Sequence, residues 1–483
     1  MSILKSSCHV ILALCIGFST TTLAIETNAP ELEHSDFGAD PLTERVLGEM
    51  IMQQIYGSDL FITDHSVNEY LKGFLNKFEA HIDNKSLLPH FFAIDTPELN
   101  AFTFFGNHVA VHSGLILTVN NESELAAVLA HETAHILQHH LSRMITINKQ
   151  MMPVTFAEIM AAVAVGALGS PDAGVHLATA ALAGHTQNLI NFTRDHEKEA
   201  DRIGMQLLSQ TQFDPSSMAT VFQRMQEQSR YRETPPEYLL THPLFDARIA
   251  DAQNRAKQFN KKSVDSSFLF HLVRAKLRAQ TDQASKKTVK EFKQHLSSNT
   301  YDNEDAERYG YAIALFKSNK PKEAQTILEE LIARYPHEWI ISLTLADVEA
   351  YQGHLTQALQ RTETLFLAHP KNYAILMQYA GFLLKNKQPR EVIKLLFKYR
   401  KSPGEDPSAY QLLARAYSQL GKKTDLHRMQ AEWYFARGDA RSAIEQMNLA
   451  VESAKKNKDI RSQIEKRKQE MLNAFQQQAK IRL

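Results

Sequence analysis

The most regular hydrophobic pattern of the chain lies in the stretch that follows Asn121. Apolar residues recur there at the three- and four-residue spacing of one helix face: Leu125, Val128, Leu129, Ile136 and Leu137. Asn121 can cap the free N–H groups of such a helix, and Glu124 stands three residues on, in the capping-box position. The pattern therefore predicts a helix that starts near Asn121 and runs to about residue 140.

The segment before this helix predicts two further helices and a small sheet. Amphipathic patterns indicate helices at about 42–56 and 65–82. Three short apolar, aromatic or β-branched runs follow, with Pro97 and Gly106-Asn107 between them, at 90–94, 101–105 and 108–111. We expect these runs to form an antiparallel sheet. The last run leads directly into the central helix, where it either binds an extended substrate by strand addition or serves only as a core strand.

The second half of the chain is a repeat. From about residue 268 helices alternate with short turns, and matching residues lie 34 positions apart: Ala324, Ala358 and Val392; Asn319, Gly353, Lys387 and Gly421; and Pro336 and Pro370. A 34-residue helix–turn–helix period with small packing residues is typical of tetratricopeptide repeats. The pattern predicts an all-α solenoid with a concave surface for protein partners.

Length and charge fit this division. A chain of 483 residues has room for two or three domains, and the polar linker NKKSVDSS separates a first domain at 25–259 from the repeats at 268–483. The fold class expected is therefore mainly α, with a small sheet in the first domain. The formal net charge is zero, which gives no indication of nucleic-acid binding. Residues 1–260 hold 16 basic and 29 acidic residues, whereas residues 261–483 hold 38 basic and 25 acidic residues. The two halves either dock through a salt-sensitive contact, or each half is solvated, or the basic half binds an acidic partner or anionic lipid.

The N-terminus has the pattern of an export signal. A basic start, the apolar run CHVILALCIGF and the small-residue site ending at Ala24 predict a signal peptide at 1–24, cleaved near Ala24. An uncleaved anchor is the alternative, although the apolar run is short for a membrane span. Both cysteines, Cys8 and Cys15, lie in this segment. The mature chain is thus expected to lack thiols, which excludes a disulfide framework and a cysteine protease.

The central helix carries the arrangement H-E-x-x-H. His131 and His135 are one turn apart, so their imidazoles face the same way and can share one zinc ion, while Glu132 stands beside it as a candidate general base. His139 continues the spacing, but eight residues of helix would place it about 12 Å from His131, too far for the same ion. We interpret His139 and His140 as a polar helix edge.

The third ligand is expected from a second helix. In the run RDHEKEAD, Glu197 and Asp201 lie one turn apart. Glu197 can bind the metal while Asp201 accepts the outer N–H of a zinc-binding histidine and fixes its orientation. Glu199 points elsewhere on this helix, and we expect Glu199→Gln to change zinc binding little.

These motifs together resemble the HtpX/Ste-type gluzincin metallopeptidases. HETAH, EKEAD some sixty residues later, and Thr241-His242-Pro243-Leu244 with Arg248 carry the resemblance, as do Asn100-Ala101-Phe102 and the run at 108–111. The resemblance spans about residues 85–250 and implies an α+β gluzincin domain with one zinc ion. It also places His242 at the active site. There His242 is either a fourth metal ligand, which would keep the enzyme inhibited, or a stabiliser of the tetrahedral oxyanion.

This chain combines the family's motifs with an export signal and C-terminal tetratricopeptide repeats. In this combination it resembles the bacterial periplasmic proteases of the family. This implies a periplasmic zinc endopeptidase that degrades misassembled outer-membrane β-barrel proteins and aids their assembly, with the repeats docking protein partners. The alternative is a periplasmic chaperone or scaffold with a silent or structural metal site. A structural site does not need Glu132, which favours the enzyme.

An Ala-, Val- and Met-rich stretch at 151–190 predicts a helical hairpin that covers the cleft or touches a membrane surface.

Overall fold

The computed structural model describes most of the chain beyond residue 40: residues 41–148, 187–230, 238, 242–243, 246–259, 264–281, 285–399, 406–454 and 457–482. The expected export segment at 1–24 lies outside these residues, as does nearly all of the expected hairpin at 151–190. Within the described ranges, no helix is both long enough and apolar enough to cross a membrane.

The sheet of the first domain has three strands in the order β1-β3-β2. They are β1 (His90–Ile94), β2 (Ala101–Phe104) and β3 (His108–His112). β2 and β3 form an antiparallel hairpin whose turn contains Gly106 and Asn107 in the left-handed conformation, at φ 81° and 60°. β1 instead pairs in parallel with β3. The prediction of an antiparallel sheet was therefore wrong in this detail, because the chain crosses to the far side of the sheet after β1 and returns through the hairpin.

The strand order also changes which strand can receive a substrate. β3 lies in the middle of the sheet, so both of its edges are already paired. β1 and β2 are the two outer strands, and β2 packs beside the central helix α4. Of the two alternatives for the run at 108–111, the structure therefore supports the core strand. A short apolar run gives no sign of its position in the strand order, so the sequence could not reveal this.

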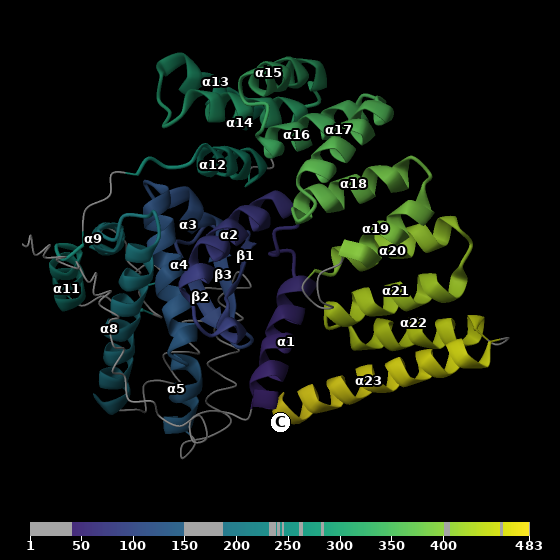
Figure 1. The fold of residues 1–483 in the computed structure, drawn as a ribbon, viewed down its shortest axis with the longest axis horizontal. Coiled ribbons are helices and arrows are strands. Elements are labelled where there is room, and N and C mark those ends of the chain that lie inside the picture. The colour runs from purple at the N-terminus through teal and green to yellow at the C-terminus, as the bar shows by residue number, and fades with distance from the viewer. Residues whose placement is uncertain are drawn as a thin grey trace, which may run out of the picture. The chain divides into compact units, whose positions relative to one another are not determined.

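Helices surround the sheet on both faces (Figure 1). The helices of the first domain are α1 (Pro41–Gly57), α2 (His65–Phe78), α3 (Ser113–Thr118), α4 (Glu122–Leu137), α5 (His140–Asn148), α8 (Gln187–Gln210), α9 (Ser217–Arg230) and α11 (Asp246–Ala256), with short 3-10 turns at Glu79–His81 and Lys85–Leu87. α4 packs between β2 on one side and α8 and α9 on the other, and nearly all of its residues are buried. Asn121 caps α4 by accepting a hydrogen bond from the Glu124 backbone N–H, as predicted.

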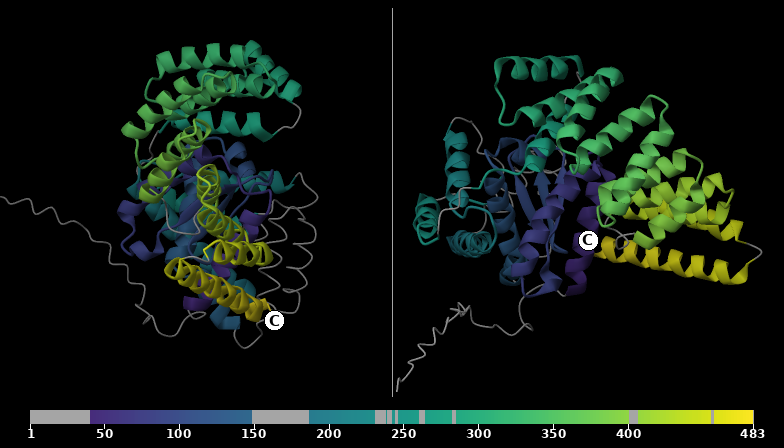
Figure 2. Two further views of the ribbon diagram at one scale, coloured as in Figure 1. Left: turned by 90° about the vertical axis from the view of Figure 1, so that its right-hand side faces the viewer. Right: turned by 45° about the horizontal axis from the view of Figure 1, so that its top comes forward.

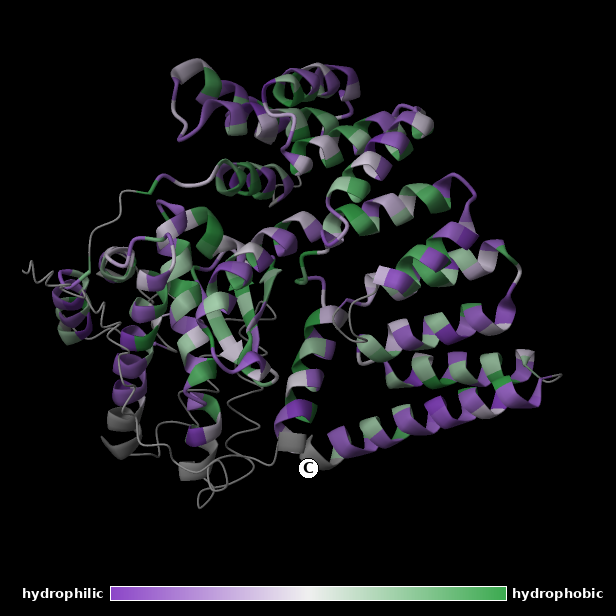
Figure 3. Ribbon diagram, viewed as in Figure 1, coloured by the Kyte–Doolittle hydropathy of each residue, from purple (hydrophilic) through white to green (hydrophobic). Residues whose placement is uncertain are grey.

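The second half is a stack of helices, as the repeat predicts (Figures 1 and 2). Its helices are α12 (Phe268–Thr281), α13 (Ser285–Ser298), α14 (Glu304–Lys317), α15 (Pro321–Arg334), α16 (Trp339–Tyr351), α17 (Leu355–Ala368), α18 (Tyr373–Lys385), α19 (Pro389–Tyr399), α20 (Ser408–Gln419), α21 (Lys423–Ala436), α22 (Ala440–Ser453) and α23 (Lys458–Arg482). From α13 onward, helices adjacent in sequence pack against each other, whereas α12 packs against α14. In Figure 3 the last of them, α23, is largely hydrophilic along its length.

The repeated positions have a structural reason. Asn319, Gly353, Lys387 and Gly421 all end a helix with a positive φ, between 57° and 90°, which lets the chain turn tightly into the next helix. The small or β-branched residues of the repeat, Ala324, Ala358 and Val392, are fully buried where neighbouring helices meet. The 34-residue period thus repeats one turn and one packing contact.

Helices α1, α2 and α3 of the first domain contact the solenoid, and α3 packs against α12. α2 packs against α12 and α18, and the Lys276 ammonium of α12 lies 2.8 Å from the Asp64 carboxylate at the start of α2. α1 packs against α21 and α23, where the Gln478 amide donates to Gln53 Oε1 at 3.1 Å. The repeats are thus attached to the first domain through buried polar contacts as well as apolar packing.

Candidate metal centre

Two helices bring the predicted motifs together. His131 and His135 extend from α4, and Glu197 extends from α8, which packs directly against it. Gly204 of α8 makes this approach possible, because a Cβ at that position would lie only 3.0 Å from the His131 backbone nitrogen. A larger residue would hold the two helices farther apart, and with them the side chains that face each other.

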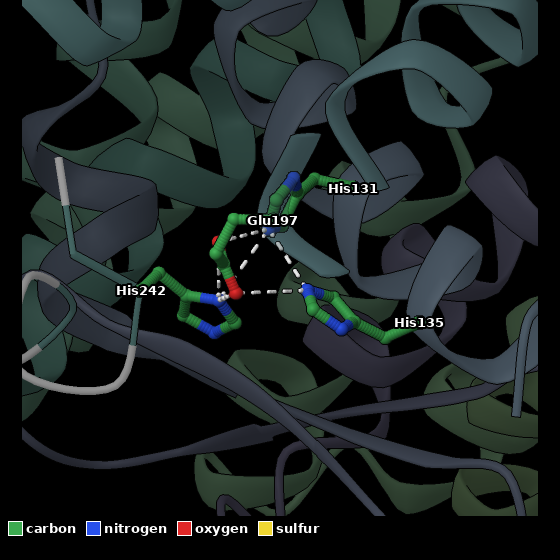
Figure 4. A group of neighbouring side chains, drawn as sticks. All are labelled: His131, His135, Glu197 and His242. Carbon is green, nitrogen blue, oxygen red and sulfur yellow. Dashed lines mark hydrogen bonds and ion pairs between the residues drawn. The ribbon is translucent and has the colours of Figure 1, made fainter. Parts of the chain in front are cut away.

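Four side chains converge in this space: His131, His135, Glu197 and His242 (Figure 4). One donor atom from each lies within 4.8 Å of the others. The Nε2 atoms of His131 and His135 are 3.0 Å apart, and Glu197 oxygens lie 3.4 Å from the first and 3.6 Å from the second. His131, Glu197 and His242 are buried, and His135 is partly exposed.

The donor set fits zinc. Zinc ligands at about 2.0–2.1 Å in a tetrahedron lie roughly 3.3 Å from one another, and the distances between these donors scatter around that value. Imidazole nitrogens and a carboxylate oxygen are also the donors that zinc takes in catalytic sites. Among the described residues, no other group of His, Cys, Asp or Glu side chains converges in this way.

His242 enters the cluster from the other side of the site. Its Nδ1 lies 3.0 Å from Glu197 Oε1 and 3.4 Å from His131 Nε2, while its Nε2 lies 3.4 Å from Glu132 Oε1. The Tyr238 ring stacks on the His242 ring at 4.6 Å between centroids, and the Tyr238 carbonyl accepts the His242 backbone N–H. The imidazole is therefore held between the metal-binding side chains and the candidate base.

Asp201 and Arg248 support the cluster from behind. Asp201 Oδ1 lies 3.0 Å from His131 Nδ1, on the side of the ring that faces away from the cluster. The buried Arg248 guanidinium donates to both Asp201 oxygens, reaches Glu197 Oε2 at 2.8 Å and donates to the Pro243 carbonyl. Burial alone would raise the pKa of Asp201, but Arg248 and the His131 contact outweigh it and hold that pKa below its usual value.

Glu132 is fully buried beside the cluster. Thr103 of β2 places its hydroxyl 2.9 Å from Glu132 Oε2 and 3.0 Å from the Glu132 backbone carbonyl, so the edge strand contacts the candidate base directly. Burial raises the pKa of Glu132, although His242, His131 and Thr103 act in the opposite direction. A carboxyl with a raised pKa is suited to taking up a proton and releasing it again.

The structure corrects the interpretation of His139 and His140. α4 ends at Leu137, and His139 has a φ of 52°, so the predicted helix does not continue to residue 140. His139 is not part of the cluster. His140 is only 3% exposed and its Nδ1 lies 3.0 Å from His135 Nδ1, so it is no polar helix edge. The sequence could not show this, because a single left-handed histidine has no reliable signature.

Comparisons with known proteins agree with this site. Residues 65–256 match peptidase family M48, and residues 349–416 match a tetratricopeptide repeat. The beta-barrel assembly-enhancing protease of Escherichia coli (strain K12) is 32% identical over 85% of this chain and 84% of its own length. The chain belongs to the family of the beta-barrel assembly-enhancing proteases. A putative beta-barrel assembly-enhancing protease of Vibrio cholerae is 31% identical over 92% of this chain and 91% of its own length.

A more distant relative matches a smaller share of the chain. The mitochondrial metalloendopeptidase OMA1 of Schizosaccharomyces pombe is 30% identical over 40% of this chain and 54% of its own length. The match to peptidase family M48 and the metalloendopeptidase relatives identify this beta-barrel assembly-enhancing protease family member as a zinc metalloendopeptidase. The mainly α fold, with an α+β peptidase domain followed by a repeat solenoid, is confirmed.

Several side chains around the site were not predicted from the sequence. Thr103 lies in an ordinary strand pattern, and nothing in that pattern indicates that its hydroxyl faces Glu132. Arg248 was noted as part of the family resemblance, but its contacts with Asp201 and Glu197 follow only from the packing of α11 against α8. Tyr238 and His140 likewise had no pattern of their own. A motif marks the candidate metal ligands, whereas the residues that support them come together only in the tertiary fold.

Proposed function

We propose that the chain is a periplasmic zinc-dependent endopeptidase in which His131, His135 and Glu197 bind one zinc ion and Glu132 is the general base. The observation that carries the proposal is the convergence of these donors at distances suited to one ion, with the buried Glu132 carboxylate beside them. A structural metal site needs no such carboxylate.

Each side chain of the site has a separate role in peptide hydrolysis. Bound zinc supplies a Lewis acid that acidifies water and polarises the scissile carbonyl. Glu132 takes the proton of the attacking water and passes it to the leaving amine. Thr103 holds the Glu132 carboxylate in place, Asp201 fixes the ring of His131, and Arg248 balances the charges of Glu197 and Asp201.

The first test compares four substitutions. Glu132→Gln should retain zinc and lose proteolysis, because the amide cannot accept the proton. Glu197→Gln should lose most zinc binding, and Asp201→Ala should weaken it about 10- to 100-fold. Asp195→Asn, on the same helix and 78% exposed, is the control and should behave as wild type. Metal analysis that finds zinc loss in Glu132→Gln but not in Glu197→Gln would contradict these roles.

His242 is proposed as an inhibitory fourth ligand in the resting enzyme. Its Nδ1 lies among the metal-binding donors while its Nε2 lies beside Glu132, so one ring fills the position that water needs and also covers the base. Displacement of this histidine, when a partner binds the repeats, would open the site. The alternative is that His242 stabilises the tetrahedral oxyanion.

The two roles of His242 predict opposite results for one variant. As an inhibitory ligand, His242→Ala should keep zinc and raise basal proteolysis, including self-cleavage. As an oxyanion stabiliser, the same variant should keep zinc and lower turnover. Self-cleavage should disappear in the double variant with Glu132→Gln, which serves as the control. Proteolysis equal to that of wild type would contradict both roles.

The substrates and partners are proposed from the relatives. Those relatives are named as proteases that enhance β-barrel assembly. We therefore expect misassembled outer-membrane β-barrel proteins and their assembly machinery as substrates and partners, with the solenoid as docking surface and no role for nucleic acid. An extended substrate segment can pair with β2, whose outer edge is paired with no other strand among the described residues.

Substrate trapping tests this assignment and its rival. Glu132→Gln, incubated with a periplasmic extract, should retain β-barrel proteins that wild type cleaves. A variant lacking residues 268–483 should retain fewer. If the protein is instead a chaperone or scaffold with a silent metal site, wild type and Glu132→Gln should retain the same proteins and neither should cleave them.

A further inference from the structure

A line of polar contacts leads away from His135 on the side opposite the metal-binding donors. His135 Nε2 faces the cluster, and its Nδ1 lies 3.0 Å from Nδ1 of His140. The other ring nitrogen of His140, Nε2, lies 3.1 Å from Glu199 Oε2. The Arg143 guanidinium donates to the same Glu199 oxygen at 3.0 Å. Four side chains from three helices are thus connected end to end.

The backbone between α4 and α5 makes the first contact possible. Residues five apart on a continuous helix point about 140° away from each other, so His140 could not reach His135 if α4 continued. The left-handed His139, with a φ of 52°, ends α4 and turns the chain so that the His140 ring returns toward His135. Left-handed conformations are uncommon in residues other than glycine, and such local strain often accompanies a functional site.

The His140 ring is also held on its face. The imidazole of His196 from α8 stacks on it, with centroids 4.1 Å apart and planes 10° from parallel. His140 is 3% exposed, so it has little room to rotate. α8 therefore supplies Glu197 to the metal-binding cluster and both Glu199 and His196 to the support of His140.

One arrangement of hydrogens satisfies the whole line. A neutral His135 that binds metal through Nε2 carries its hydrogen on Nδ1, and this N–H must donate outward. The acceptor in reach is the lone pair of His140 Nδ1. His140 then carries its own hydrogen on Nε2 and donates it to the Glu199 carboxylate. Each ring nitrogen in the line is then either a donor or an acceptor. The Glu199 carboxylate determines this assignment, because it can only accept a hydrogen bond.

We propose that His140 is a positioning residue for the metal centre, which fixes the ring of His135 and is itself fixed by Glu199. The inference rests on the zinc site proposed above. His131 receives the same support directly from a carboxylate, Asp201, whereas His135 receives it through an intervening imidazole. Glu199 thereby has an indirect part in zinc binding, which the sequence pattern did not indicate.

Two near-isosteric replacements of His140 separate a hydrogen-bonding role from simple space filling. In His140→Asn the amide oxygen takes the place of Nδ1 and can still accept the His135 N–H. In His140→Gln the amide group takes the place of Nε2, so it reaches Glu199 but not His135. Zinc affinity, measured by competition with a chelator, should stay near wild type in His140→Asn and fall about 10- to 100-fold in His140→Gln and His140→Ala.

The visible absorption of the cobalt-loaded protein gives a second readout that does not depend on activity. The band positions should match wild type in His140→Asn and change in His140→Gln, because the His135 ring loses its fixed orientation. Glu199→Ala should shift both readouts in the same direction as His140→Gln, and Lys198→Ala, 59% exposed on the same helix, should shift neither. A cooperative unfolding transition, measured for each variant without zinc, shows that the variant is folded.

The outcomes distinguish this inference from the proposed function. If wild type binds zinc at one ion per chain and the Asn and Gln variants are equally affected or equally unaffected, the positioning role is wrong and the zinc site stands. If wild type itself fails to bind zinc, the proposed function is wrong, and the inferred role of His140 is wrong as well.

Discussion

At the scale of single residues, Thr103 links the edge strand to the candidate base. Its hydroxyl can donate to the Glu132 carboxylate at 2.9 Å. Thr103→Val keeps the shape of the side chain and removes the donor. A hydrogen bond to a charged group contributes about 1.5–3 kcal/mol, so kcat should fall roughly 10- to 100-fold with zinc content unchanged. Thr103→Ser restores a hydroxyl and should recover most of the activity. Equal loss in the Ser and Val variants would contradict this role.

A second residue, His112 of β3, makes stability depend on pH. It is 1% exposed, and neither ring nitrogen has a hydrogen-bond partner among the described residues. Burial lowers the pKa of His112 to about 3, so the unfolded chain takes up a proton below about pH 6.5 that the folded chain does not. The free energy of unfolding should therefore fall as pH drops from about 6.5 toward 3, by at most about 1.4 kcal/mol per pH unit.

His112→Leu removes this titration and should flatten the pH dependence by that amount. Denaturant unfolding of both proteins at matched zinc across this pH range measures the two slopes, so an overall change in stability does not affect the comparison. Parallel slopes would show that His112 does not contribute.

The candidate metal ligands and the supporting Asp201 could be predicted because each belongs to a short, regular spacing. His131, His135, Glu197 and Asp201 follow from one-turn separations on two helices, and both helices are present, although α4 ends at Leu137 rather than near residue 140. The supporting residues have no such spacing. Thr103, His140 and Arg248 reach the site only because strands and helices distant in sequence pack together, and no local pattern encodes that packing.

At the scale of elements, Gly204 controls how closely α8 approaches α4. A Cβ there would lie 3.0 Å from His131 N and 3.1 Å from the Ala130 carbonyl carbon and oxygen. Gly204→Ala should gain about 1 kcal/mol of helix propensity and lose about 1–3 kcal/mol through overpacking. We expect a net loss of stability together with weaker zinc binding, because the helix that carries Glu197 moves away.

Gly73 offers a matched control for Gly204. It lies inside α2, and a Cβ there would meet nothing within 4 Å. Gly73→Ala should therefore raise the free energy of unfolding by about 0.5–1 kcal/mol and leave zinc affinity unchanged. If Gly204→Ala proved as stabilising as Gly73→Ala, the close approach of α4 and α8 would not depend on the glycine.

The helices and repeats were easier to predict than the sheet. A 34-residue period repeats the same left-handed turn and the same buried packing residue, so the prediction of helices rests on several occurrences of one pattern. The three strands have no comparable redundancy. Their apolar runs and turn residues indicate that they are strands. The pairing of the strands depends on the path of the chain after β1, and residues 95–100 do not specify that path.

At the scale of the whole molecule, Lys276 joins the solenoid to the first domain. Its ammonium contacts the Asp64 carboxylate and the Ser66 hydroxyl, and the pair carries the charge signs that the uneven distribution predicted. Salt sensitivity of the docking stays a prediction. Removing one partner of a buried ion pair costs about 3–5 kcal/mol, and we expect the lower end because Asp64 is 18% exposed.

Lys276→Met should therefore uncouple the two parts. Both tryptophans, Trp339 and Trp433, lie in the solenoid, so tryptophan fluorescence reports its unfolding, whereas zinc release reports the first domain. The two transitions should coincide in wild type and separate in Lys276→Met. Lys286→Met, on the exposed surface of α13, should leave them coincident. Coincident transitions in Lys276→Met would show that this pair does not couple the parts.

The position of α1 affects how the stack of repeats comes apart. An open array of repeats frays from its free end, one helix pair after another. Here α1 rests closely on the hairpin turn at Phe105 and also holds the far end of the array, through Gln53 to Gln478 and through Gly57 to Arg437. The last helix pair therefore has no independent melting step. Amide hydrogens of α22 and α23 should exchange about as slowly as those of α1, so that unravelling from that end requires disruption of the domain that carries the metal centre.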